Sequence, residues 1–373
     1  NWAGGTGTYT TVTNAANDGA ANAYQIAGAG NIPVTSDVRI ASGATLDLNG
    51  CNQVVASLAD SGVGGGSIIN SAATKPLTLS INPASGSTTF SGVISDNGSA
   101  NAVSVAKTGA GTQIFNGINT YLGSTTVNGG TLQLGSGGNL GTGVLGVISG
   151  TFDLNGRSQT VSNFGGTGGV LTNSSSAAST LTVNIPANSG GNLGAQLTTP
   201  STGDIDIVVN PTSGGAASNT ALANSANTFR GSITVNGTGS LTGNDSFGVL
   251  GINTDGALGD PENDIVLNDG GTICNMFNPT AAGGWPGHAV FTLGASRTIT
   301  LTGIGGVLRV GYGEACGVNG EITGEGSLAK TDGGAITLGG SISNTYTGTT
   351  ILGGTGKLVL AKTGGATAIP GNI

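Results

Sequence analysis

The stretch 107–135, KTGAGTQIFNGINTYLGSTTVNGGTLQLG, returns in altered form at 330–360 as KTDGGAITLGGSISNTYTGTTILGGTGKLVL. Both copies open on Lys-Thr, carry Asn-Thr-Tyr in the middle and end on alternating apolar residues. Self-similarity over such a length is typical of repeat architectures, in which each copy is one supersecondary unit that stacks on its neighbours. We therefore expect function to lie on a long surface rather than in one deep pocket.

Further copies extend the pattern along the chain. The segment 227–237 is a degenerate third copy of the Asn-Thr-Tyr block. A second block, Thr-Leu-Asp-Leu-Asn-Gly at 45–50, recurs as Thr-Phe-Asp-Leu-Asn-Gly at 151–156, and each is followed by Gln and Val at the same spacing. The segment 361–365 opens like another copy, so we expect the repeat array to continue there.

The apolar residues alternate within each copy, which sets the fold class. In Thr-Leu-Gln-Leu at 131–134 the two Leu side chains share one face, and short alternating runs bounded by Gly and Asn are strands. Near-identical blocks favour stacked coils over the hairpins of an antiparallel barrel or sandwich. The sequence predicts an all-β parallel β-helix, a β-solenoid in a single elongated domain. At roughly 20–25 residues a coil it would make about 15–18 coils, with these residues inside: Leu132, Leu134, Leu358 and Leu360.

Composition excludes several classes of function. Gly makes up 73 of 373 residues and charged residues only 8%, yet the apolar residues are regularly spaced, which disfavours disorder. The formal net charge of −8 argues against nucleic-acid binding and against docking on anionic lipid, because both need basic side chains. No run of 18 apolar residues occurs, so no membrane-spanning helix is expected.

The Lys-Thr-Gly-x-Gly opening, the Asn-Thr-Tyr-x-Gly-Ser/Thr-Thr block and the Gly-Gly-Thr-Leu-x-Leu exit resemble the autotransporter-associated β-strand repeat. The resemblance covers 107–135 and 330–362 well and 227–241 in part, and it is poor over 1–43 and 274–317. It implies a right-handed parallel β-helix in the passenger region of an exported bacterial surface protein. The motif carries no catalytic residue, so the resemblance implies no catalytic site and no cofactor.

Two segments depart from the repeat. Residues 1–43 are repeat-poor and are expected to form an N-terminal cap or edge region ahead of the solenoid at 44–373. An insertion around 274–290 holds the residues that we consider for a binding loop, because insertions in solenoids are often binding loops: Met276, Phe277, Trp285 and His288. The alternative is a loop that folds its aromatic side chains over a gap in the stack.

Acidic residues raise an enzymatic alternative, since parallel β-helices include polysaccharide lyases and hydrolases. Asp204 and Asp206 should face the same side of one strand, and the densest acidic stretch is Asp260, Glu262, Asp264 and Asp269. Either set could hold calcium weakly, but solvated turns are the simpler interpretation. A groove lined by three or more carboxylates with a Lys or Arg would favour the enzyme.

The cysteines and the single histidine suggest no site. Cys51, Cys274 and Cys316 are an odd number, so at least one is unpaired within the chain. Cys274 and Cys316 are either bridged between neighbouring coils or free. One histidine cannot build a histidine-based zinc site, so we predict neither a metal site nor a catalytic site.

The sequence thus predicts a non-catalytic, extracellular or cell-surface structural rod that is adhesive. Its expected partner is itself, stacked end to end into a filament, or further repeats of the same chain, with surface glycans as a further candidate. The alternative function is a polysaccharide-active β-helix enzyme or a carbohydrate-binding module.

Overall fold

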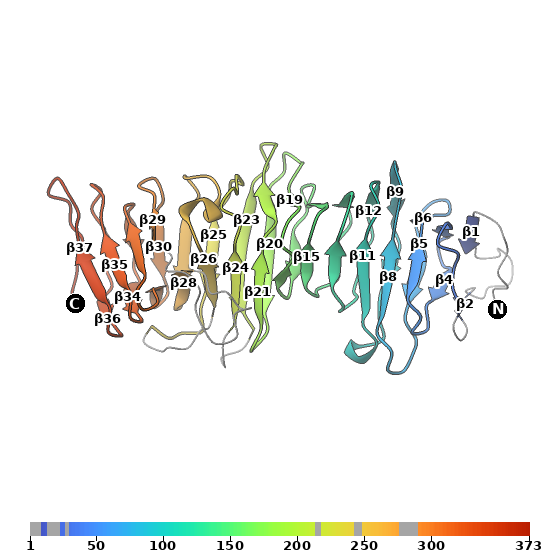
Figure 1. The fold of residues 1–373 in the computed structure, drawn as a ribbon, viewed down its shortest axis with the longest axis horizontal. Helices are drawn as coiled ribbons and strands as arrows, with labels where there is room; N and C mark the ends of the chain where they lie inside the picture. Colours follow the sequence, from blue (N-terminus) through green and yellow to red (C-terminus); the bar gives the residue numbers. More distant parts are fainter. Residues whose placement is uncertain (1–8, 13–22, 27–29, 213–217, 242–247, 276–289) are drawn as a thin grey trace. The chain divides into compact units, whose positions relative to one another are not determined.

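The computed structural model describes most of the chain, over residues 9–12, 23–26, 30–212, 218–241, 248–275 and 290–373. The chain divides into two compact units, which are described separately. Unit 1 consists of Asn1–Val161 and Gly165–Ser179, and unit 2 of Ser162–Phe164 and Thr180–Ile373. In Figure 1 the strands of each unit stack side by side in the order of the sequence.

Unit 1 is built from short strands that pair with the strand one coil away. Near its N-terminal side, two sheets hold β1 (Tyr9–Val12), β3 (Asp37–Ile40) and β6 (Ser57–Asp60), and β2 (Ala23–Gln25), β4 (Thr45–Asp47), β7 (Ser67–Ile69) and β10 (Val93–Ile94). A third sheet places in succession β5 (Gln53–Val55), β8 (Leu77–Ile81), β11 (Val103–Lys107), β13 (Thr125–Val127) and β15 (Leu145–Val147). A fourth places β9 (Ser87–Phe90), β12 (Thr112–Phe115), β14 (Thr131–Leu134), β16 (Thr151–Asp153) and β19 (Val170–Thr172).

Unit 2 repeats this arrangement with three sheets. Within this unit the first begins with β20 (Ser179–Ile185) and continues with β23 (Ile205–Pro211), β25 (Ile233–Asn236), β27 (Ile265–Asn268), β30 (Ile299–Thr302) and β33 (Ile322–Gly324). We call the part from β23 to β33 the 205–324 sheet. The second holds β21 (Gly190–Leu193), β24 (Asn219–Leu222), β26 (Val249–Ile252), β28 (Gly271–Asn275), β31 (Gly305–Arg309), β34 (Ser327–Thr331) and β36 (Thr350–Leu352). The third holds β29 (Val290–Leu293), β32 (Ala315–Val318), β35 (Ala335–Leu338) and β37 (Lys357–Leu360).

The remaining elements are short. Three further strands are β17 (Gln159–Val161), β18 (Phe164–Gly165) and β22 (Gln196–Thr198). Helical structure in the described residues is confined to two 3₁₀ segments, η1 (Ser99–Asn101) and η2 (Asp255–Leu258). The predicted all-β class is confirmed.

The strands pair in parallel, which confirms the predicted β-solenoid. Val105 pairs with Thr125, 20 residues later, and Thr125 with Leu145, another 20 residues on. In unit 2 the coils lengthen, since Ile233 pairs with Ile265 and Ile265 with Ile299. These longer coils are the reason that the fold has about 12 turns rather than the 15–18 expected from a uniform coil.

Apolar side chains fill the inside of the coils. Phe90, Phe115 and Leu134 follow one another in register across three coils and are fully buried, as is Leu132. The prediction for the last copy is wrong in part, because Leu358 is only half-buried and Leu360 is 54% exposed. Both align with buried residues of β35, but no described strand pairs with the other side of β37.

The asparagine of each Asn-Thr-Tyr copy ties three coils together. The Asn119 side chain accepts a hydrogen bond from the Ile94 backbone N–H (2.8 Å) and donates one to the Asn139 carbonyl (2.7 Å). Asn344 accepts in the same way from Ile322 N–H (3.0 Å) and donates to a carbonyl of the following segment. The degenerate copy keeps the arrangement, since Asn227 links 197 with 257 (2.9 and 2.7 Å). The repeat is therefore a device that satisfies backbone groups at a buried corner.

The second block has an equally specific structural basis. The Asp47 carboxylate accepts hydrogen bonds from the backbone N–H groups of Asn49 and Ser71, both at 3.0 Å. Asp153 accepts from the equivalent residues, Asn155 at 2.9 Å and Ser174 at 3.0 Å. The asparagine after each carboxylate has a positive φ, 44° at Asn49 and 47° at Asn155, which Asn tolerates better than most residues. Similar sequence thus builds the same corner twice.

The segment 1–43 contains regular solenoid structure where it is described. Strand β3 pairs with β6 in parallel, and Ile32 donates its backbone N–H to the Gln53 side chain (2.7 Å). The interpretation of 1–43 as a cap stays a prediction.

Candidate functional site: an acidic hollow in unit 2

Charged side chains gather where three coils of unit 2 enter the 205–324 sheet. The residues just before β23, β25 and β27, together with Asp206 at the start of β23, line a surface hollow of about 340 Å³. We call it the acidic hollow, and its lining is Asp204, Asp206, Arg230, Gly231, Ser232, Asp260, Glu262, Asn263 and Asp264. Five carboxylates and one guanidinium therefore face a shared volume.

Arg230 balances one of these carboxylates. Its Nε lies 3.4 Å from Oδ1 of Asp204, and its Nη2 donates to the carbonyl of Ser201 at 2.7 Å. Both side chains of the ion pair are nearly half exposed, at 43% and 46%. A pair that is so open to water adds little to stability, and the hollow keeps an excess of negative charge.

The other carboxylates are oriented by hydrogen bonds between and within coils. Asp206 accepts from both the backbone N–H and the hydroxyl of Ser232, each at 2.8 Å. Asp264 accepts from the N–H of Thr298 at 3.2 Å, and Asp260 from the N–H of Glu262 at 3.0 Å. These bonds hold the acidic groups at the surface in fixed positions.

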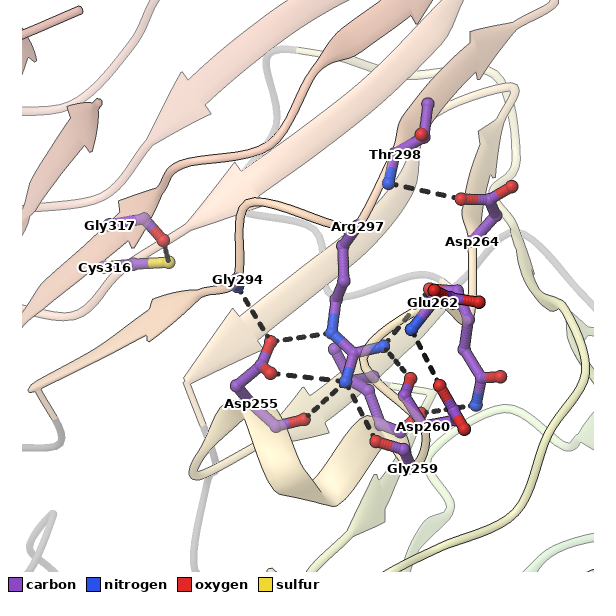
Figure 2. Close-up of polar contacts among 12 residues, drawn as sticks. Asp255, Gly259, Asp260, Glu262, Asp264, Gly294, Arg297, Thr298, Cys316 and Gly317 are labelled. Atoms are coloured by element: carbon purple, nitrogen blue, oxygen red, sulfur yellow. Dashed lines mark hydrogen bonds and ion pairs between the residues drawn. The ribbon is translucent and has the colours of Figure 1, made fainter. Parts of the chain in front are cut away.

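A buried arginine secures the segment that carries three of the acids. Figure 2 shows the Arg297 guanidinium enclosed by the 255–263 segment. Its Nε lies 2.6 Å from Oδ1 of Asp255, and its Nη1 donates to the carbonyls of Asp260 (2.8 Å) and Asn263 (3.1 Å). Only 1% of the Arg297 side chain is exposed. Arg297 therefore fixes the backbone on both sides of Glu262 without lining the hollow itself.

The family comparison identifies the repeat. The model of the passenger-associated-transport-repeat matches residues 105–134 and 328–355. These ranges largely coincide with the two similar stretches at 107–135 and 330–360. The chain carries two passenger-associated transport repeats. The recognition of an autotransporter passenger repeat from the sequence is confirmed.

The chain is also similar in sequence to one curated protein, an autotransporter. The chain is 27% identical over 321 residues to the adhesin BmaC autotransporter of Brucella suis biovar 1 (strain 1330). The match covers 81% of this chain and 8% of the relative, so the chain spans a small part of the length of that protein. No solved structure matches significantly. The passenger repeats and this similarity place the protein at the bacterial cell surface or outside the cell.

The structure brings together part of the predicted acidic set and separates the rest. Asp204 and Asp206 lie on the same side of their strand, as expected, and Asp260, Glu262 and Asp264 join them across two coils. Asp269 follows the opposite end of β27, where its carboxylate accepts from Ile304 N–H at 3.2 Å. Within the described ranges no three Asp, Glu, Cys or His side chains are placed to hold a metal ion. The alternative of a weak calcium site, which the sequence left open beside solvated turns, therefore finds no support there.

Sequence reasoning did not select the two arginines of this region. Arg230 and Arg297 reach their acidic partners across coils, 26 and 42 residues away in sequence. The signal that could have found them is scarcity, since the whole chain has only 10 Lys and Arg residues. In a passenger-repeat chain so poor in charge, a basic residue beside a strand is a good candidate for an ion pair.

The predicted binding loop lies outside the described residues, which end at 275 and resume at 290. Met276, Phe277, Trp285 and His288 therefore stay predictions. The proposed bridge between Cys274 and Cys316 is absent: both are buried thiols outside any disulfide, and half-buried Cys51 forms no disulfide either. Burial raises the pKa of Cys274 and of Cys316 to about 12, which makes these thiols poor nucleophiles. No helix in the described part of the chain has the length and hydrophobicity to cross a membrane.

Proposed function

We propose that this chain is a non-catalytic, adhesive segment of an exported protein at the bacterial surface. The observation that carries the proposal is the parallel β-solenoid that contains two passenger-associated transport repeats, in each of which an asparagine joins neighbouring coils. The similarity to a protein named as an adhesin supports the same function.

The fold suits this function physically. Within each unit every coil is hydrogen-bonded to the next, so each unit is rigid, and its outward side chains repeat along the stack. The repeat residues are used to join coils, as Asn119 and Asp153 show. Side chains on the outer faces of the sheets are then available to contact a target.

The test is adhesion of beads that carry the purified chain. We expect these beads to bind host cells or extracellular matrix in larger numbers than beads that carry an unrelated acidic protein of similar size. Beads that carry the chain after unfolding in urea should lose the effect, because the outer faces exist only in the solenoid. Equal binding of native, unfolded and unrelated proteins would contradict the proposal.

We also propose that the uncovered edge of β37 pairs with a strand of a further solenoid coil. That coil comes either from more repeats of the same chain or from a second copy of the chain, which would extend a filament. Val359 and Leu360 are 41% and 54% exposed there, and an uncovered strand edge pairs readily with another strand. Sedimentation of the purified chain tests whether separate copies associate end to end. Growth into long fibres supports this association, and monodisperse single chains at high concentration contradict it. Adding more repeats should abolish any association by covering β37.

The acidic hollow favours one other candidate function. A groove lined by three or more carboxylates and a Lys or Arg is what a polysaccharide-active enzyme would need, and the hollow holds five carboxylates and Arg230. The experiment is incubation with acidic and neutral polysaccharides, followed by measurement of released reducing ends. Release that disappears in an Asp206→Asn or Glu262→Gln variant would overturn the non-catalytic proposal. We expect no release from either the natural chain or the variants.

A further inference from the structure

The outer face of the 205–324 sheet carries a regular row of polar side chains. Ile207, Ile233, Ile265, Ile299 and Ile322 follow one another in parallel register and are fully buried. The residue before each of them points outward, because side chains alternate along a strand. These outward residues form what we call the carboxylate row: Asp206, Ser232, Asp264, Thr298 and Glu321.

The row alternates between a carboxylate and a hydroxyl at every coil. Asp206 is hydrogen-bonded to Ser232, and Asp264 accepts from the backbone of Thr298. Glu321 continues the pattern, since it accepts from the hydroxyl of Thr345 in the next coil at 2.6 Å. A carboxylate therefore recurs at every second coil over five coils, and the last of them, Glu321, interacts with the Lys362 ammonium, which donates to the carbonyl of the adjacent Gly320 at 2.9 Å.

The alternation fixes the distance between charges. Neighbouring parallel strands lie about 4.8 Å apart, so carboxylates two coils apart are separated by about 10 Å along the stack. In a polyproline II segment three residues span about 9.3 Å, and every third side chain points the same way. In a β-strand the side chains on one face repeat at about 6.6 Å. The row therefore matches the polyproline II period and not that of a β-strand.

On the side of the carboxylate row away from the acidic hollow, the outward rows of β25, β27 and β30 are uncharged. The next outward row contains Thr234, Val266 and Thr300, which are aligned and partly exposed. The third row is a ladder in which each asparagine amide donates to the side chain of the preceding coil, Asn236 to Asn210 at 2.6 Å and Asn268 to Asn236 at 3.0 Å. Negative charge beside uncharged rows attracts a cationic partner and repels an anionic one.

We propose that this face docks an extended polypeptide in the polyproline II conformation, with Lys or Arg at every third residue facing the carboxylate row. The inference rests on the proposed adhesive function and names the chemical class of the partner. The acidic hollow lies beside the first half of the row and gives a long basic side chain room to reach Asp260 and Glu262. The neutral rows accommodate the small or apolar residues between the basic ones.

The experiment uses two synthetic peptides of identical composition and the full chain. One peptide consists of Pro-Pro-Lys triplets, and the other has the same residues with its lysines grouped at the two ends. Fluorescence anisotropy of the labelled peptides should show binding that is about tenfold tighter for the periodic peptide and that weakens as salt rises. Equal affinity for the two peptides, or no binding of either at millimolar concentration, would overturn the proposal.

Variants of the protein give a second, independent measurement. Asp264→Asn with Glu321→Gln removes two charges of the row and should reduce the affinity for the periodic peptide about tenfold. The matched control is Asp37→Asn with Glu325→Gln, which changes net charge equally off the row and should leave most of the affinity intact. Circular dichroism and melting temperature verify that all variants fold. A preference for the periodic peptide that survives the row variant would sink the proposal, as would equal losses in row and control variants.

The result of the peptide-binding experiment can be distinguished from the result of the adhesion test. Beads that adhere to cells while the periodic peptide does not bind would leave the adhesive function in place and eliminate this partner. Binding of a neutral oligosaccharide to this face, competed by neither peptide, would assign the face to glycans and refute the inference.

Discussion

Arg297 places its guanidinium Nε 2.6 Å from the Asp255 carboxylate, although the two residues are 42 positions apart in the sequence. The same guanidinium also donates to the carbonyls of Asp255 (3.0 Å) and Gly259 (3.1 Å) from Nη2. A planar group with five donors thus holds a 3₁₀ turn and the acidic segment after it. The acidic hollow depends on this internal support.

Replacing Arg297 by Met should therefore destabilise unit 2. Removal of one partner of a buried ion pair typically costs about 3–5 kcal/mol, because the remaining carboxylate loses its compensation. Urea unfolding measures the loss, and hydrogen exchange should accelerate at 255–264. The control is Arg230→Met, whose half-exposed pair should be worth less than about 1 kcal/mol. Similar losses in both variants would contradict this role of Arg297.

Asn119→Ala and Asn344→Ala should each destabilise the unit that contains them. Each substitution leaves a buried N–H of the preceding coil and a carbonyl of the following segment without the side-chain partner seen here. An unsatisfied buried group costs about 1–3 kcal/mol. Thermal melting checks the expectation against Thr120→Ala, an exposed neighbour in the same copy. A melting temperature of Asn119→Ala equal to that of Thr120→Ala would rule out the bridging role.

Gly117→Ala should be far more damaging than Gly146→Ala. A Cβ at Gly117 would lie 1.9 Å from the carbonyl oxygen of Gly92 in the preceding coil, so the backbone of one coil must move. At Gly146 the nearest atom is 3.8 Å away, an ordinary contact. We expect a loss of at least about 2 kcal/mol for Gly117→Ala and less than about 1 kcal/mol for Gly146→Ala, measured by urea unfolding. The reverse order would show that coil spacing does not limit side-chain size at Gly117.

The cysteines should differ in reactivity at pH 8. With a pKa raised to about 12 by burial, Cys274 and Cys316 are thiolate in only about one molecule in ten thousand at that pH. We expect iodoacetamide to label half-buried Cys51 first, and the other two only after urea is added. Peptide mass spectrometry reads the three sites separately, and rapid labelling of Cys316 in the native chain would contradict its burial.

Much of the fold could be predicted because short sequence patterns, the alternation of apolar residues and the repeated corner motifs, determine it. The alternation at 131–134 puts Leu132 and Leu134 inside whatever the exact coil length, since successive side chains of a strand face opposite ways. Similar residues at Asp47 and Asp153 form similar corners, because each corner is built from backbone groups two residues away and one coil away. The sequence by itself therefore determined the parallel solenoid, its core face and the passenger repeats.

The tertiary structure alone decided which distant residues meet. Coils of unit 2 are unequal, so sequence spacing does not tell that Arg230 lies beside Asp204 or that Asp264 joins the hollow while Asp269 does not. It also decided that Leu360 is exposed although its pattern equals that of buried Leu134. Burial of an inward side chain requires a neighbouring coil above as well as below. Which coil neighbours which is set by strand pairing across 19 to 35 residues, a property that no local pattern contains.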